Sequence, residues 1–105
     1  MNQTKTAAEQ RHHDRIAELG CIVCLLSLHI EDTPAEVHHV RVRHGWGRSG
    51  HMAVVPLCAF HHRHGRFAIH NCGAEVFERE HGFSEVELLR LVNVRLGIEP
   101  DDEAW

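Results

Sequence analysis

Apolar residues recur at helical spacing near the start of the chain. Over residues 7–19 they occupy one face of a predicted helix, with Thr6 as its N-cap and Gly20 as the residue that ends it. This apolar face is narrow, so most of the helix should remain in contact with solvent. We therefore predict that His12 and His13 are exposed helix residues and bind no metal.

A second helical pattern lies near the other end. Leucine and valine form a broad apolar stripe over residues 84–96, and Ser84 with Glu87 makes a capping box at its start. A shorter helix is expected over residues 74–81, where Gly82 ends it. The sequence therefore predicts one N-terminal helix and two C-terminal helices.

The middle of the chain has a different pattern. Valine-rich runs over residues 36–43 and 52–57 predict two strands, and the three glycines of residues 44–50 predict the loop between them. Residues 58–63 begin a short helix or turn that ends near Gly65. Two strands that lead into a helical turn form a hairpin–helix core, so the predicted fold class is small α+β.

Length and charge narrow the picture further. The 105 residues predict one domain, with flexible ends over 1–6 and 98–105. No apolar run reaches the length of a membrane span and no secretory signal is visible, so we expect a soluble cytoplasmic protein. The net charge of −4 argues against a general polyanion binder, yet residues 37–74 contain five arginines, eight histidines and no acid. Such a segment can bind phosphate through its local field, unless its arginines pair with the flanking acids.

Four cysteines and twelve histidines are the main signal of the composition. A C-x-x-C pair in a chain without a secretory signal is more often a metal site than a disulfide, and small domains often need a metal. A second knuckle, C-x-x-H, follows the predicted strands. Together they predict a zinc knuckle that holds structural Zn²⁺ through Cys21, Cys24, Cys58 and His61. Two alternatives remain open: His62 closes the site in place of His61, or the cysteines are free and buried. Cys72 is left over and is expected to be a buried thiol.

Two histidine pairs flank the predicted hairpin. His38 and His39 are neighbours on a strand, so their side chains should point to opposite faces. They therefore cannot simply chelate one ion, which indicates that one binds metal and the other has a different task. His61 and His62 can likewise face two different sites from one helical turn.

These segments resemble those of the HNH (His-Me finger, ββα-metal) endonucleases, and more closely the phage recombination-enhancement (Ref-like) HNH nucleases. The matching segments are ELGCIVC, EVHHVR, GWGRSGH, VVPLC-x-x-HH, AIH and AEVFEREHG. The resemblance implies a single HNH nuclease domain with a ββα-metal core. It also implies that His38 is a ligand of a catalytic divalent ion, that His39 is the general base, and that His62 is a second ligand.

The family's central asparagine is missing from this chain. Its place falls near Ala53, and no asparagine lies between residues 35 and 69. His51 is the nearest polar substitute and could orient the base or bind metal. His70 is a candidate third ligand, with an ordinary surface histidine as the alternative.

The implied activity is metal-dependent hydrolysis of DNA phosphodiester bonds. An imidazole can accept a proton from water near neutral pH, and Mg²⁺, Mn²⁺ or Zn²⁺ can stabilise the charge on the phosphate and the leaving oxygen. Phosphate contacts are expected from four arginines: Arg41, Arg43, Arg48 and Arg66. Contacts with phosphate read no bases, so we expect little sequence specificity. The resemblance further implies a recombination protein as partner and a bacterial or phage-infected cell as location.

Two other functions compete with this one. The missing asparagine and the negative net charge would also suit a catalytically inactive zinc-binding module that binds nucleic acid or a protein. The histidine content alone would suit a metal-storage or sensing protein, which should bind more than two ions per chain.

Overall fold

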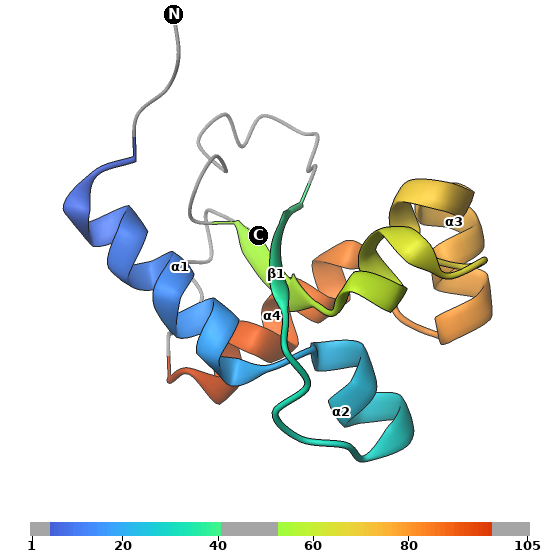
Figure 1. Ribbon diagram of the computed structural model, residues 1–105, viewed down its shortest axis with the longest axis horizontal. Coiled ribbons are helices and arrows are strands. Elements are labelled where there is room, and N and C mark those ends of the chain that lie inside the picture. Colours follow the sequence, from blue (N-terminus) through green and yellow to red (C-terminus); the bar gives the residue numbers. More distant parts are fainter. Residues whose placement is uncertain (1–4, 41–52, 98–105) are drawn as a thin grey trace, which may run out of the picture.

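The computed structural model describes residues 5–40 and 53–97. Within them the chain forms, in order, α1 (Ala7–Leu19), α2 (Ile22–Leu28), β1 (Glu36–His39), β2 (Val54–Leu57), the π-helical turn η2 (Phe60–His64), α3 (Ile69–His81) and α4 (Glu85–Arg95). Figure 1 shows the strand pair in the middle of the molecule, with α1 and α3 on opposite sides of it. The predicted small α+β class, with its hairpin–helix core, is confirmed.

The two strands are antiparallel, and β2 is the more buried of them. Glu36 pairs with Leu57 and His38 with Val55, while the Val40 amide donates to the Ala53 carbonyl at 2.8 Å beyond the end of the ladder. All four residues of β2 are buried, because α1, α2 and α4 all contact this strand. That burial explains why the sequence reads as an unbroken apolar run here. The parts of the predicted hairpin that comprise residues 41–52 lie outside the described residues.

The core joins every helix to the strand pair. Fully buried side chains come from α1, α2, β2, α3 and α4, and the largest of them are Phe77, Ile16, Ile22, Leu57 and Leu88. This arrangement fixes the positions of the cysteines, since Cys21 directly precedes buried Ile22 and Cys58 directly follows buried Leu57. Among the helices in the described part of the chain, none combines the length and apolar character that a bilayer crossing requires.

Helix α1 has the predicted bounds but a different buried face. Thr6 accepts a hydrogen bond from the Glu9 amide at 3.1 Å, and the Glu9 carboxylate accepts one from the Thr6 amide at 2.8 Å, which completes a capping box. The prediction that His12 and His13 are exposed is wrong, since they are only 5% and 4% exposed. Helix α1 packs on both strands, and because it offers few large apolar residues, the two imidazoles fill that face.

The C-terminal helices follow the predicted signals closely. Ser84 and Glu87 form the expected capping box at the start of α4, and Gly82 ends α3 at φ 88°. Helix α3 consists of two helical segments that meet at a kink, where Gly73 has φ 87° and ψ 166°. The predicted helix over residues 74–81 is the segment after the kink, and the segment that begins at Ile69 was not predicted. Residues 1–4 and 98–105, most of the ends predicted to be flexible, lie outside the described residues, whereas Thr6 has a defined place as the cap of α1.

Gly20 connects α1 to α2 in a conformation that is essentially limited to glycine, with φ 85° and ψ 167°. A Cβ atom at this position would lie 3.0 Å from Asp32 Cα. We expect Gly20→Ala to lower the free energy of unfolding by about 1–3 kcal/mol through backbone strain, with a further loss from displacement of the Asp32 backbone. Chemical denaturation measures this change in the free energy of unfolding. Gly73→Ala is the matched control, because Gly73 has nearly the same φ and ψ but open space around it. Equal losses in the two variants would contradict the role of the Asp32 contact.

Candidate metal centre

The four predicted zinc ligands meet between α2 and the turn that follows β2. Cys21 is the N-cap of α2, and Cys24 lies in the first turn of the same helix. Cys58 directly follows β2, and His61 lies in η2. All four side chains are buried, and their ligand atoms lie within 4.8 Å of one another.

The distances among these atoms can be compared with those around a tetrahedral zinc ion. Ordinary Zn–S and Zn–N bond lengths require about 3.8 Å between two sulfurs and about 3.5 Å between sulfur and nitrogen. The Sγ atoms of Cys24 and Cys58 are 3.8 Å apart. His61 Nδ1 lies 3.6, 3.7 and 3.3 Å from the sulfurs of Cys21, Cys24 and Cys58. The donor set and its spacing therefore fit a metal ion such as zinc.

Burial favours the neutral forms of Cys21 and His61. Desolvation raises the pKa of the Cys21 thiol to about 12 and lowers the pKa of His61. A neutral imidazole is already the form that binds a metal, and a thiol gives up its proton when a cation coordinates it. His81 packs perpendicular to His61, with 5.3 Å between ring centroids, and its Nε2 lies 3.0 Å from the Phe67 carbonyl oxygen. The His61 ring thus packs against α3 through His81.

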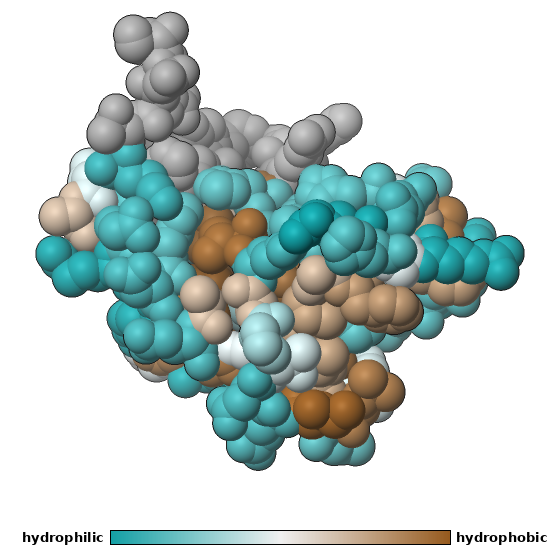
Figure 2. Space-filling view, in the orientation of Figure 1, coloured by the Kyte–Doolittle hydropathy of each residue, from teal (hydrophilic) through white to brown (hydrophobic). Residues whose placement is uncertain are grey.

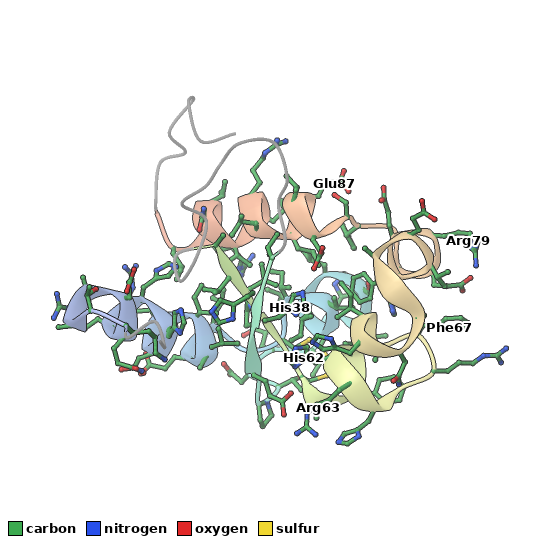
Figure 3. All side chains as sticks on the ribbon, turned by 90° about the horizontal axis from the view of Figure 1, so that it is seen from above. His38, His62, Arg63, Phe67, Arg79 and Glu87 are labelled. Atoms are coloured by element: carbon green, nitrogen blue, oxygen red, sulfur yellow. The ribbon has the colours of Figure 1, made fainter. Side chains whose placement is uncertain are left out.

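A second group of imidazoles lies on the other side of η2. His38 comes from β1, His62 from η2 and His70 from the start of α3. His62 Nε2 lies 3.2 Å from His38 Nδ1 and 3.0 Å from His70 Nε2. Figure 3 shows His38 and His62 directed toward one another across the gap between β1 and η2. We call these three residues the histidine cluster.

The turn η2 explains how adjacent histidines reach separate sites. The Gly65 amide donates to the Phe60 carbonyl at 2.8 Å, an i to i+5 bond that makes the turn wider than an α-helical one. From this turn His61 points to the cysteines, while His62 points to β1. The sequence left open whether His61 or His62 closes the cysteine site. The geometry has His61, and not His62, beside the sulfurs.

Carboxylates contact the histidine cluster from two sides. Glu85 Oε2 lies 2.6 Å from His38 Nε2, and Glu36 Oε1 lies 2.7 Å from His62 Nδ1. Arg63 also donates to both oxygens of Glu36, from Nε to Oε1 at 2.9 Å and from Nη2 to Oε2 at 2.6 Å. The hydrogen bonds from Arg63 and then from His62 lower the pKa of Glu36 to about 2. Sequence reasoning identified neither carboxylate.

His39 lies apart from the histidine cluster. It is exposed where His38 is buried, as expected for neighbours on a strand, and its ring meets that of His13 with centroids 5.4 Å apart.

Arg66 is exposed, with its guanidinium 5.2 Å from the Phe67 ring centroid. Ala53, at the place of the family's asparagine, is buried, and its backbone carbonyl accepts a hydrogen bond from the Val40 amide. Four predicted site residues lie outside the described residues: Arg41, Arg43, Arg48 and His51.

The remaining cysteine is separate from the metal centre. Cys72 was expected to be buried, but it is half-buried in α3, where its thiol donates to the Gly73 carbonyl at 3.5 Å. The kink at Gly73 leaves this carbonyl outside the regular helical pattern. Cys72 therefore serves as an internal comparison for the three buried cysteines of the cluster.

Comparison with protein-family models gives a match over most of the chain. A family model described as "Recombination enhancement, RecA-dependent nuclease" matches residues 5–89. The matched range runs from the residue before the α1 N-cap into the middle of α4, so it includes both the metal centre and the histidine cluster. A search of curated proteins finds no match.

Proposed function

Because this chain belongs to the family of recombination-enhancement, RecA-dependent nucleases, we propose that it is a metal-dependent endonuclease of the HNH type that hydrolyses DNA phosphodiester bonds. The observation that carries the proposal is the histidine cluster, in which imidazole nitrogens from β1, η2 and α3 converge beside a separate buried Cys/His site. Two such sites suit one ion that holds the fold and one that serves the chemistry.

The residues divide between these sites. Cys21, Cys24, Cys58 and His61 would hold structural Zn²⁺, and the histidine cluster would hold Mg²⁺, Mn²⁺ or Zn²⁺. Nitrogen-rich ligands favour a transition metal or zinc over Mg²⁺. When bound, such an ion supplies charge stabilisation for the phosphate and the departing oxygen.

His39 is the proposed general base. The family resemblance supports this role, and the ring is exposed at the end of β1, one residue from His38, where water and a phosphate have access to it. Imidazole is suited to accept that proton near neutral pH. His13, packed edge-on against the ring, limits the orientations that His39 can adopt. His51 remains a proposed aid to the base, in place of the asparagine that Ala53 replaces.

Four of the five arginines of residues 37–74 are proposed to bind DNA, and Arg63 is not among them. Arg63 is held by Glu36 through three hydrogen bonds, so the alternative that flanking acids neutralise arginines holds for that residue. Arg66 is exposed, and together with Arg41, Arg43 and Arg48 it would contact phosphates and read no bases. The family's name supports a RecA-type recombination protein as partner. The proposed location is the cytoplasm of a bacterial or phage-infected cell.

The main competitor is a catalytically inactive zinc-binding module. Ala53 favours it, because the side chain where the family carries asparagine is apolar and buried. Such a module would bind duplex DNA or a protein with unchanged affinity after His39→Ala.

The test is nicking of plasmid DNA with Mg²⁺, Mn²⁺ or Zn²⁺, each with and without a RecA-coated single strand. We expect His39→Ala to lower the rate by about 10²–10⁴-fold, which is the usual contribution of a general base. His64→Ala, which removes an exposed imidazole from η2 outside both sites, should leave the rate within about 3-fold. Full activity in His39→Ala would contradict its role as base, and no cleavage by the natural protein under any condition would favour the inactive module.

A further inference from the structure

We propose that Glu85 and Glu36 are positioning residues that fix the tautomers of His38 and His62, so that both rings turn an unprotonated nitrogen toward one point. The inference rests on the proposed function, because that point is where the divalent ion would bind. It adds two acidic residues, from α4 and β1, to a site that the sequence analysis built from histidines alone.

The tautomers follow from which nitrogen meets a carboxylate. An ionised carboxylate only accepts hydrogen bonds, so the ring nitrogen beside it must carry the proton. His38 Nε2, 2.6 Å from Glu85, is therefore protonated, and in a neutral ring this leaves Nδ1 with a lone pair. His62 Nδ1, 2.7 Å from Glu36, is likewise protonated, which leaves the lone pair on Nε2.

The two nitrogens left with lone pairs are the ones that face each other. His38 Nδ1 and His62 Nε2 are 3.2 Å apart, and neither has a proton to donate to the other in these tautomers. Two lone pairs at that distance repel unless a cation lies between them. The distance is close to the roughly 3.3 Å that separates two nitrogens on one tetrahedral zinc ion. The carboxylates thus prepare the pair for a cation.

The surroundings strengthen the contact with Glu85. The side chains of His38 and Glu85 are 7% and 15% exposed, so little water competes for this hydrogen bond. Glu85 is the first residue of α4, and the Ser84–Glu87 capping box fixes the backbone there. Figure 3 places His38 between the strand pair and α4, which carries Glu85. Glu36 differs, since it is 33% exposed and divides its charge between His62 and Arg63. We therefore expect Glu85 to contribute more than Glu36.

Carboxylates that bind the outer nitrogen of a histidine ligand usually change metal affinity by about 10–100-fold. We expect Glu85→Ala to raise the Kd for Mn²⁺ or Zn²⁺ at the histidine cluster by that factor. Glu85→Gln should raise it less, because an amide oxygen still accepts the hydrogen bond but carries no charge. Glu78→Ala removes the same charge from the exposed surface of α3 and should leave Kd unchanged.

The experiment is calorimetric titration of protein that already contains one zinc ion, with each variant's melting temperature measured first. Nitrogen-15 NMR of the His38 ring provides a second measurement, in which Nε2 should be the protonated nitrogen in the natural protein and in Glu85→Gln, but not uniformly in Glu85→Ala. A loss of affinity together with the mixed tautomer would support the proposal. A Kd for Glu85→Ala equal to that of the natural protein would overturn it while leaving the proposed nuclease function intact. If the natural protein binds no second ion, both the positioning role and the metal-dependent function are contradicted.

Discussion

Replacement of Cys24 by serine is expected to unfold the protein. Its sulfur lies 3.8 Å from that of Cys58 and 3.7 Å from His61 Nδ1, so it belongs to the four-ligand centre that joins α2 to the end of β2. Binding of a structural zinc ion contributes about 10–16 kcal/mol of apparent folding free energy. The whole stability of a small domain is only about 5–15 kcal/mol, so loss of the ion removes most or all of it.

Circular dichroism melting and elemental analysis measure the effect. We expect Cys24→Ser to show no cooperative thermal transition and to hold one zinc ion fewer per chain. Cys72→Ser exchanges the same atoms at a half-buried cysteine outside the centre and should melt within a few degrees of the natural protein. A strong chelator should reproduce the Cys24→Ser result in the natural protein. Similar melting of the two serine variants would show that the cysteine centre does not hold the fold.

His62→Ala is expected to abolish cleavage without unfolding the protein. His62 is the middle member of the histidine cluster, since its Nε2 is the atom close to both His38 and His70. Its loss should prevent binding of the second ion and lower the cleavage rate on the order of 10³-fold or more, because the ion's charge stabilisation is worth several kcal/mol. Glu36 keeps its hydrogen bonds to Arg63 in this variant, so no buried charge is left unpaired.

The same plasmid assay and an ion count per chain measure this outcome. His62→Ala should hold one ion and melt cooperatively, whereas Cys24→Ser should not melt cooperatively at all. The contrast tests the division into two sites. Cleavage by His62→Ala at the natural rate would remove the histidine cluster from the mechanism, and its unfolding would assign His62 a structural role.

Local signals in the sequence predicted much of the fold. Thr6, Gly20, Ser84 and Gly82 mark helix ends through their own backbone and side-chain chemistry, and the structure has helices with those ends. The proximity of Cys21 and Cys24 to Cys58 and His61 was also predictable, because C-x-x-C and C-x-x-H spacing has few other uses in a small domain.

Features that depend on long-range packing were not predictable in the same way. His12 and His13 are buried because α1 meets the strand pair with a face that has few large apolar residues. Glu85 follows His38 by 47 residues and contacts it only because α4 packs against the strand pair. No rule of sequence spacing predicts that contact. Glu36 carried a signal that could have been used, since it lies two residues before His38 and alternation places both on one face of β1.

His61 and His62 are consecutive residues of the wide turn η2. One is directed to the cysteines and the other to the histidine cluster. A single peptide bond therefore connects the centre proposed to maintain the fold to the centre proposed for the chemistry. An ion at either proposed centre would restrict the same few backbone torsions of η2. By thermodynamic linkage, any change that an ion at one proposed centre makes in the affinity of the other centre must be equal in the reverse direction. Oxidation of the cysteines would therefore be expected to disturb the histidine cluster as well, although none of the three oxidised residues belongs to it.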